Sequence, residues 1–299
     1  ETAKVTIEGD GSVTVLIGTQ ASGQGHKTAY AQIVSERLGI SPDKVSVVQG
    51  DSDLIEKGAG TGGSRSIPTG GTSVSNAGIR LSDRVKTLAS DMLEAAPGDI
   101  ELEDGEIRIA GTDRATSFAA VAAKAMEMGE PLTETEEWGP KVPTYPNGTH
   151  IVEVEIDPET GSTHVARYTI VDDFGVTMNP MLLEGQVHGG VAQGIGQALM
   201  EHTVYEAESG QLVTASFQDY QMPRAEDFPD ISFETRNVPC ATHPLGMKGA
   251  GEAGAIGACP AVVNAVVDAL FRATGQTHID MPVTPMKLWT ALRQGPAAA

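Results

Sequence analysis

Apolar and polar residues alternate through the first seventeen positions of the chain, and this alternation predicts a β-hairpin. Residues 3–17 hold two alternating runs around the turn sequence Gly9-Asp10-Gly11. Helical spacing follows at residues 29–38, and Gly39 predicts the end of that helix. A strand is expected at residues 45–49. The chain therefore begins with strands and a helix in alternation.

Further helices and strands are predicted up to residue 128. A polar, glycine-rich loop, GAGTGGSRSIPTGG, precedes a helix predicted at residues 73–95. Strand-like pieces lie within residues 100–109, and a short helix is expected at residues 117–128. Ser117 is the candidate N-cap of that helix, because its hydroxyl can accept a backbone N–H.

A connector is indicated by residues 129–148, which combine four prolines with an acidic run. We therefore expect three parts along the chain: a first subdomain at residues 1–136, a connector at residues 137–148 and a second subdomain at residues 149–299.

The second half opens with two predicted strands, at residues 151–156 and 163–171, joined by a turn. A helix is predicted at residues 180–201, followed by strands near residues 203–207 and 211–217. These elements repeat the mixture of strands and helices that the first half contains.

The last part of the chain is predicted to be irregular at residues 221–258 and helical after them. Pro260 fits a first helical position, where its missing N–H costs nothing, and Gly275 ends the apolar stripe. Strands that alternate with helices in both halves predict an α+β fold of mixed α/β layers, rather than a helical bundle or a β-sandwich.

Composition excludes several classes of protein. Lys and Arg number 20 against 40 Asp and Glu, and the net charge of −20 repels nucleic-acid phosphates and anionic lipid. Two cysteines, Cys240 and Cys259, are typical of a reducing compartment and too few to hold an iron–sulfur cluster. No apolar run is expected to reach the roughly 18 residues of a membrane span, and no signal sequence opens the chain. We expect a cytoplasmic protein.

Glycine is abundant, 35 of 299 residues, and gathers in clusters where backbone can approach a ligand closely. In the first cluster, residues 18–25, a strand leads into a helix, and Gln24 adds an amide that donates and accepts. A tight turn with an exposed glutamine is the alternative. The second cluster, residues 69–75, again opens a helix, and hydroxyls that only cap the helix are the simpler explanation there.

The third cluster interrupts the predicted helix at residues 184–196, EGQVHGGVAQGIG, at a cost of about 1 kcal/mol for each glycine relative to alanine. Tight helix packing explains glycine at such positions. It explains a neighbouring glutamine less well, since a buried amide needs partners.

The fourth cluster, KGAGEAGAIG at residues 248–257, contains the spacing G-x-G-x-x-G. A dinucleotide site needs a strand just upstream and a helix that begins within the motif, but Pro244 and Gly246 interrupt the first and Pro260 postpones the second. Glu252 then stands as a carboxylate between glycines. Desolvated carboxylates act as general bases, and an acid that only favours the helix dipole is the alternative. The seven histidines show no zinc-ligand spacing.

Taken together, the clusters resemble the motifs of the molybdenum hydroxylases, the family of xanthine dehydrogenase, aldehyde oxidase and carbon monoxide dehydrogenase. Five ordered motifs carry the resemblance: GTQASGQGH, GSRSIPTGGTSVSNAG, EGQVHGGVAQGIGQAL, DYQMPRAEDFP and KGAGEAGAIGACPAVVNAV. The chain is similar only to the C-terminal part of the large, cofactor-binding subunit. The resemblance implies two subdomains with the cofactor in the cleft between them.

The resemblance also implies which residues form the site. The cofactor would be molybdenum held by the dithiolene of molybdopterin, with a terminal phosphate or an appended cytidine nucleotide, so no side chain is expected to ligate the metal. Gln193 would contact the pterin, and Glu252 matches the catalytic carboxylate beside molybdenum. The family's cofactor-binding positions match seven residues in all: Gly23, Gln24, Ser73, Val74, Ser75, Gln193 and Gly251.

The implied activity is oxidation of an aldehyde, an N-heterocycle or carbon monoxide with water as the oxygen source and Glu252 as general base. The implied partners are an iron–sulfur subunit with 2Fe-2S clusters, an FAD subunit and the N-terminal half of the molybdenum subunit. Two other classes stay open. One is a non-catalytic accessory or degenerate subunit, and the other is a nucleotide-binding α/β domain that rests on Gly249, Gly251 and Gly254.

Overall fold

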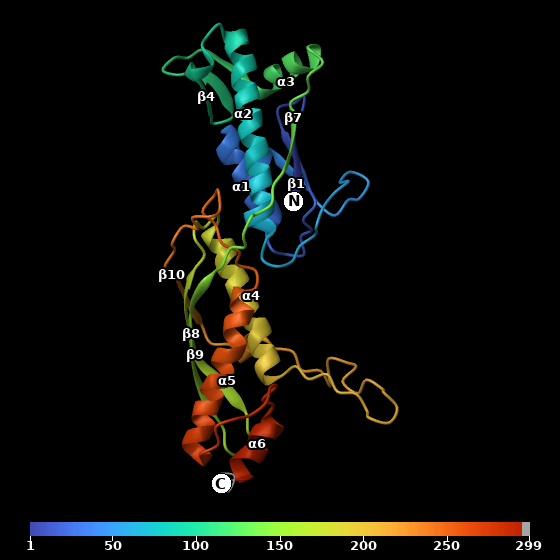
Figure 1. Ribbon diagram of the computed structural model, residues 1–299, viewed down its shortest axis with the longest axis vertical. Helices are drawn as coiled ribbons and strands as arrows, with labels where there is room; N and C mark the ends of the chain where they lie inside the picture. The colour runs from blue at the N-terminus through green and yellow to red at the C-terminus, as the bar shows by residue number, and fades with distance from the viewer. Residues whose placement is uncertain (295–299) are drawn as a thin grey trace. The chain divides into compact units, whose positions relative to one another are not determined.

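The computed structural model describes residues 1–294, which form two units (Figure 1). Unit 1 consists of Glu1–Thr144 together with Cys240–Gly249, and unit 2 consists of Tyr145–Pro239 and the described residues from Ala250 onward. The first passage of the chain between the units falls inside the predicted connector at residues 137–148. The pattern of residues does not reveal that Cys240–Gly249 belongs to unit 1, because this segment lies far along the predicted second subdomain.

A four-stranded sheet with the order β3-β2-β1-β7 forms one layer of unit 1. Strands β1 (Thr2–Ile7) and β2 (Val13–Ile17) make the predicted hairpin. Helix α1 (His26–Leu38) then leads to β3 (Val45–Val48), which pairs parallel to β2. Gly39 ends α1 in the left-handed conformation, with φ of 64°. The alternating and helical patterns of this region are confirmed.

The fourth strand, β7 (Thr133–Glu137), corrects the prediction that residues 129–148 are only a connector. It pairs antiparallel with β1 at the edge of the sheet. Its sequence TETEE contains no apolar residue, so it carries no hydrophobic alternation from which to predict a strand. Its charge is balanced from helix α2 instead, where the guanidinium of Arg84 lies 2.8 Å from the carboxylate of Glu134.

Helix α2 (Thr72–Leu93) packs against the sheet and against α1, and buries Val74, Leu81 and Val85 completely. The predicted helix at residues 73–95 is therefore confirmed. The chain is already helical before it, however, because Ser66–Gly71 forms a π-helical turn. This turn corrects the predicted loop, whose Gly, Pro and Ser content is typical of irregular structure.

A second sheet and a short helix complete unit 1. The sheet consists of β4 (Ile100–Glu103), β5 (Glu106–Ile109) and β6 (Ala115–Ser117) in that order. Helix α3 (Phe118–Glu127) follows, and Ser117 accepts the N–H of Ala120 at 3.1 Å. The predicted N-cap is thus confirmed. Short 3₁₀ turns lie at Pro42–Lys44 and Pro97–Asp99 in unit 1 and at Ala225–Asp227 in unit 2.

Unit 2 contains a three-stranded sheet with the order β10-β9-β8. Strands β8 (Asn147–Ile156) and β9 (Thr163–Asp173) form the predicted antiparallel pair. Strand β10 (Ile231–Thr235) pairs parallel with β9, inside the stretch predicted as irregular at residues 221–258. It is short, and its partner lies about sixty positions earlier in the chain, so nothing local predicts the pairing.

Three helices cover this sheet: α4 (Pro180–Leu199), α5 (Ala253–Thr274) and α6 (Pro285–Gln294). Helix α4 is where the sequence predicts it, but α5 begins seven residues before Pro260, so the prediction of a first helical position was wrong. Pro260 is exposed, as is Ile256, whose carbonyl would otherwise accept the N–H that proline lacks. Water can bond that carbonyl, and the helix tolerates the proline.

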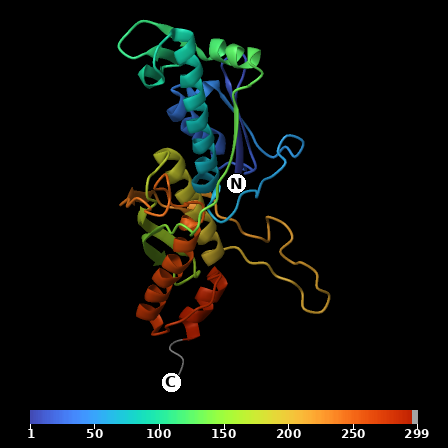
Figure 2. The ribbon, with the colours of Figure 1, turned by 45° about the horizontal axis from the view of Figure 1, so that its top comes forward.

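The segment that follows α4 extends away from the helices of unit 2 and returns to α4 at Pro223, which lies against Gly196 (Figure 2). The strands predicted near residues 203–207 and 211–217 do not form, and Tyr205 and Leu212 make only an isolated bridge. An isolated hairpin is marginal in water, and this one has no sheet or helix against which to bury its apolar side chains. Phe217 is accordingly 82% exposed.

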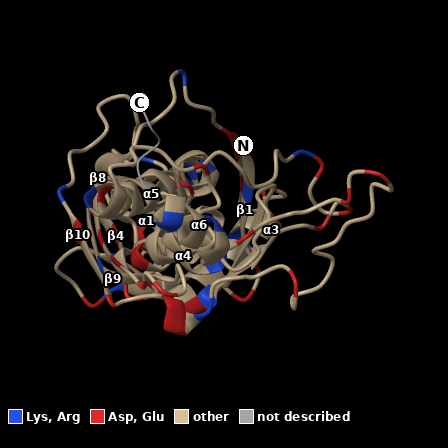
Figure 3. Ribbon diagram, turned by 90° about the horizontal axis from the view of Figure 1, so that it is seen from below, with Lys and Arg blue, Asp and Glu red and all other residues tan. Residues whose placement is uncertain are grey.

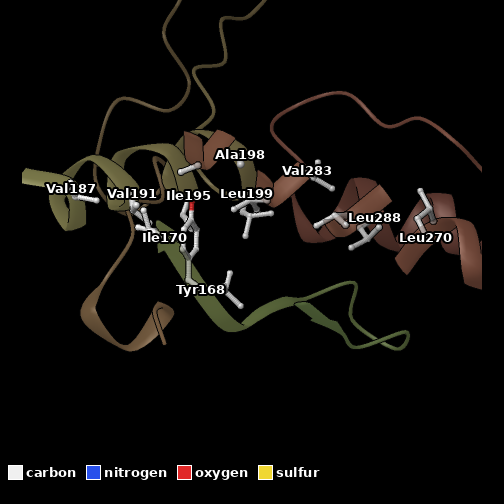
Figure 4. Packing of buried hydrophobic residues seen from close by; sticks show 14 of the residues in the cluster. Tyr168, Ile170, Val187, Val191, Ile195, Ala198, Leu199, Leu270, Val283 and Leu288 are labelled. Carbon is white, nitrogen blue, oxygen red and sulfur yellow. The ribbon is translucent and has the colours of Figure 1, made fainter. Parts of the chain in front are cut away.

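The core of unit 2 lies between the helices and the sheet (Figure 4). Tyr168 and Ile170 of β9 meet Val187, Val191 and Ile195 of α4. The buried stripe of α5 joins the same cluster with four residues: Ala258, Val262, Val266 and Leu270.

Helix α5 corrects the expectation that no segment reaches the length of a membrane span. Its 22 residues, with a mean hydropathy of 1.7 over the most apolar part, are long and apolar enough to cross a membrane. No other described helix has this property. Its buried stripe packs against α4 and β8, and 28% of its most apolar part is buried.

Two buried histidines of unit 1 predict how stability depends on pH. Burial lowers the pKa of both His26 and His243. The imidazole Nδ1 of His243 accepts the N–H groups of Leu245 and Met247, at 3.2 and 3.3 Å, and its Nε2 donates to the carbonyl of Pro68 at 2.9 Å. A protonated ring cannot accept at Nδ1, so the fold requires the neutral form.

A lowered folded-state pKa means that the unfolded chain binds the proton first as the pH falls. The two histidines therefore stabilise the fold fully above their ordinary pKa of about 6.5 and lose this contribution below it. We expect the melting temperature to fall between pH 7.5 and pH 5, and His243→Gln to reduce that slope. The exposed His278 supplies the control, and a slope altered equally by His278→Gln would contradict the assignment.

Candidate functional site

The first glycine cluster, residues 18–25, connects β2 to α1. Gly23 and Gly25 have left-handed backbones, with φ of 108° and 77°, and Gly25 is the N-cap of α1. A Cβ on Gly23 would meet no atom within 4 Å, so the backbone there is open. The Oε1 of Gln24 accepts the N–H of Ser22 at 2.5 Å. The cluster therefore presents an open backbone beside a carboxamide.

The second cluster, residues 69–75, is more enclosed than an open helix start. Three candidate cofactor-binding residues of this cluster are at most 1% exposed: Ser73, Val74 and Ser75. The Oγ of Ser73 donates to the carbonyl of Glu1 at 2.7 Å, and the Nε of Arg37 donates to the Oγ of Ser75 at 3.0 Å. Because the chain is helical from Ser66 onward, these residues do not stand at a free helix end.

The third cluster lies on α4, and its glycines face two ways. A Cβ on Gly190 or Gly194 would meet atoms of α5 at 2.9 and 2.4 Å, so both are needed for helix packing. A Cβ on Gly185 or Gly189 would meet nothing within 4 Å. Gln193 is exposed four residues after Gly189, on the same face of the helix. Packing within unit 2 explains Gly190 and Gly194, but it does not explain Gly185 and Gly189.

The fourth cluster crosses from unit 1 into unit 2. The N–H of Gly249 donates to the hydroxyl of Thr144 at 3.1 Å within unit 1. In unit 2, a Cβ on Gly254 would meet α4 backbone at 2.3 Å, and one on Gly257 would meet the ring of His150 at 2.4 Å. These glycines therefore allow close packing on either side of Glu252.

Glu252 is the N-cap residue of α5, and its side chain is exposed, as is the neighbouring Gly251. The first turn of α5 packs through Gly254 against Gly190 of α4, three residues before Gln193. Unit 2 thus brings Glu252 and Gln193 onto neighbouring helices. The residue is exposed, so the described residues do not supply the burial expected of a desolvated general base.

The structure also bears on a dinucleotide site at the fourth cluster and on a metal site built from side chains. Because α5 begins at Ala253, inside the G-x-G-x-x-G spacing, the objection that Pro260 postpones the helix was wrong. The strand that a dinucleotide site needs just upstream is nevertheless absent from residues 240–249. Within residues 1–294, no three His, Cys, Asp or Glu side chains gather so as to hold a metal ion. Lys and Arg are scattered along the ribbon among more numerous Asp and Glu (Figure 3).

Two residues that the glycine pattern does not single out, Tyr30 and Gln49, contact Thr19 of the first cluster. They form a hydrogen-bonded chain inside unit 1. Tyr30 occupies an inward position of α1, where an aromatic ring is ordinary core, and only its hydroxyl distinguishes it.

Comparison with known proteins adds a family match. The family model described as molybdopterin cofactor-binding domain matches residues 1–229. The chain is 37% identical to the 6-hydroxypseudooxynicotine dehydrogenase complex subunit gamma of Paenarthrobacter nicotinovorans, over 97% of this chain. It is 34% identical to the carbon monoxide dehydrogenase large chain of Hydrogenophaga pseudoflava, over 98% of this chain. Each match covers 37% of the relative, so the chain spans little more than a third of their length.

Solved structures give the same picture. Quinoline 2-oxidoreductase from Pseudomonas putida 86 matches with a TM-score of 0.87 and 38% identity, over 99% of this chain and 38% of that chain. A Cu,Mo-CO dehydrogenase in the carbon monoxide reduced state matches with a TM-score of 0.87 and 34% identity, over 98% and 37%. The predicted α+β fold is confirmed.

Proposed function

The chain belongs to the molybdopterin cofactor-binding domain family of the molybdenum hydroxylases, and on this basis we propose that it is the cofactor-binding portion of a molybdopterin-dependent oxidoreductase. One observation of unit 2 carries the proposal. Gly185 and Gly189 lie within the continuous helix α4 although no described atom would meet a Cβ there within 4 Å, and Gln193 follows on the same face. Helix glycines cost about 1 kcal/mol each relative to alanine, so a helix that keeps them without a packing partner favours the approach of a ligand.

The donor set of these residues fits a pterin. A pterin edge presents donors and acceptors side by side, and carboxamides such as those of Gln24 and Gln193 can meet both. Gly23 offers open backbone in unit 1, and Gly251 offers exposed backbone beside Glu252 in unit 2.

Ser73, Val74 and Ser75 would support the phosphate end of the cofactor from inside unit 1. The hydroxyl of Ser73 donates to the carbonyl of Glu1, and that of Ser75 accepts from the guanidinium of Arg37, while the apolar side chain of Val74 is fully buried. These contacts fix the first turn of α2 rather than offering free hydroxyls, so we assign the three residues to holding that backbone in place. The finer form of the cofactor, with or without a cytidine nucleotide, is proposed from the family resemblance.

Glu252 would act as the general base. When bound, the cofactor supplies a metal centre that accepts two electrons from the substrate and directs water-derived oxygen to it. The Oε atoms of Glu252 would take the proton that the water loses. Because the described residues leave Glu252 exposed, its desolvation would come from substrate and from the parts of the protein that the relatives have in addition.

The proposed substrates are an aldehyde, an N-heterocycle or carbon monoxide. The relatives include proteins named for a nicotine derivative, quinoline and carbon monoxide. The electrons would leave through 2Fe-2S and FAD subunits, since Cys240 and Cys259 are too few to hold a cluster. We propose a cytoplasmic location, because two cysteines in 299 residues are typical of a reducing compartment.

The test is purification of the native protein that contains this chain, together with everything that co-elutes. Molybdenum, iron and oxidised pterin are quantified per chain. About one molybdenum and one pterin per chain, with iron on other subunits, are expected. A complete, folded complex without pterin would overturn the proposal and favour an accessory or degenerate subunit.

A further inference from the structure

A directed chain of hydrogen bonds runs through the interior of unit 1. The Nε2 of Gln49 lies 2.8 Å from the Oγ1 of Thr19, which lies 2.9 Å from the hydroxyl of Tyr30. The Tyr30 hydroxyl donates to the carbonyl of Ser66 at 2.9 Å. The side chain of Tyr30 is fully buried, and Thr19 is 1% exposed.

The chemistry of the groups fixes the direction of every bond. The carbonyl of Ser66 can only accept, so it takes the single proton of Tyr30. The Tyr30 oxygen must then accept from Thr19, whose own oxygen accepts from Gln49. The same Nε2 of Gln49 lies 2.6 Å from the carbonyl of Thr19, which confirms that the nitrogen of the amide faces Thr19. Burial raises the pKa of Tyr30, so its proton is retained at any working pH.

This series of hydrogen bonds connects two separate glycine clusters. Thr19 lies in the first cluster, residues 18–25, and Ser66 begins the π-helical turn that leads into the second, residues 69–75. The turn also packs directly on the same hydroxyl, because a Cβ on Gly70 would lie 2.8 Å from the Tyr30 oxygen. A change at Tyr30 therefore reaches both clusters at once.

The arrangement leaves one acceptor unsatisfied. The Oε1 of Gln49 is buried and has no hydrogen-bond partner among the described residues. Unsatisfied buried acceptors are destabilising and rare in folded proteins. Fold stability alone does not account for this amide, whereas a need to hold the backbone of Thr19 in one place does.

We propose that Tyr30, with Thr19 and Gln49, forms a positioning unit that sets the spacing between the two cofactor-binding clusters of unit 1. The inference rests on the proposed binding of molybdopterin. The polar groups of its three members contact backbone carbonyls and each other, and the Nε2 of Gln49 also lies 3.4 Å from the Nδ1 of His26. We assign them no contact with the ligand. Their effect is on whether the two clusters can engage one cofactor together.

Thr19→Val and Thr19→Ser make a matched pair. Valine has the shape of threonine but lacks the hydroxyl, and serine keeps the hydroxyl. In the purified native complex, we expect Thr19→Val and Tyr30→Phe to lower pterin per folded chain at least about fivefold, and Thr19→Ser to restore the wild-type content. Circular dichroism and the melting temperature establish that the chains counted are folded.

Tyr168→Phe is the control from unit 2. The hydroxyl of Tyr168 is also buried and lies 2.8 Å from the Nδ1 of His150, so its loss should lower the melting temperature without lowering pterin content. Equal pterin in wild-type, Thr19→Val and Tyr30→Phe would overturn this inference and leave the proposed function standing. Wild-type complex without pterin would overturn both.

Discussion

Replacing Glu252 by glutamine is expected to lower turnover by about 10²- to 10⁴-fold while the pterin and molybdenum content of the complex stays at the wild-type level. Glutamine has the size of glutamate but no basic oxygen that can take up a proton at neutral pH. The side chain is exposed at the N-cap of α5, and substitutions at such positions change stability by only about 0.5 kcal/mol. Loss of activity would therefore not follow from loss of fold.

The measurement is steady-state oxidation of quinoline, nicotine and a simple aldehyde, with an artificial dye as electron acceptor, alongside pterin and molybdenum analysis. Asp268→Asn is the matched control, because Asp268 is an exposed carboxylate on the same helix, paired with Arg272 at 2.8 Å. It should leave turnover unchanged. Unchanged turnover in Glu252→Gln would refute the role as base, and loss of pterin would reassign Glu252 to cofactor binding.

The largest effect on stability is expected at the contact between α4 and α5. Gly194→Val would place its Cβ 2.4 Å from the Cβ of Ala258 and 3.1 Å from the carbonyl of Ala255, neither of which can rotate away. The two helices would have to separate. Overpacking of this kind costs about 3 kcal/mol, which corresponds to a fall of roughly 6 °C or more in the melting temperature.

Gly189→Val is the control on the same helix, because the Cβ would meet nothing within 4 Å. Its melting temperature should stay close to that of the wild type. Thermal unfolding of the two variants is compared in the complex freed of cofactor, because a bound cofactor would approach Gly189 under the proposed function. Similar destabilisation by both would mean that the open face of α4 is covered in the assembled protein, and would contradict a packing role confined to Gly194.

Local patterns account for the parts of the fold that could be predicted. The hairpin of β1 and β2, helices α1, α2 and α4, and the N-cap Ser117 all follow from alternation, helical spacing or a capping residue. What local patterns do not contain is the partner of each element. Strand β7 is polar because its place at the sheet edge beside β1 requires no apolar face, and β10 acquires its strand character from a distant partner, β9.

The candidate site divides in the same way. Gln24, Gln193 and Glu252 are predicted because glycine clusters mark them, and the structure adds which glycines pack and which stay open. Tyr30 was not identifiable, since its importance comes from bonds to Thr19 and Ser66 that only the folded chain brings together. Pro260 shows where the preference of proline for the first helical position fails as a prediction. Helix α5 begins at Ala253, before the proline, because its packing in unit 2 stabilises the earlier turns as well.

The return of Cys240–Gly249 to unit 1 has a consequence for the order in which the chain folds during synthesis. After Thr144 has been added, another 105 residues (249 − 144) must be made before unit 1 has all its parts. At ribosomal rates of about 5–20 residues per second, this takes roughly 5–20 s. During that interval the carbonyl of Pro68 lacks the bond from His243. The nascent first unit is therefore held incomplete until most of the second has left the ribosome.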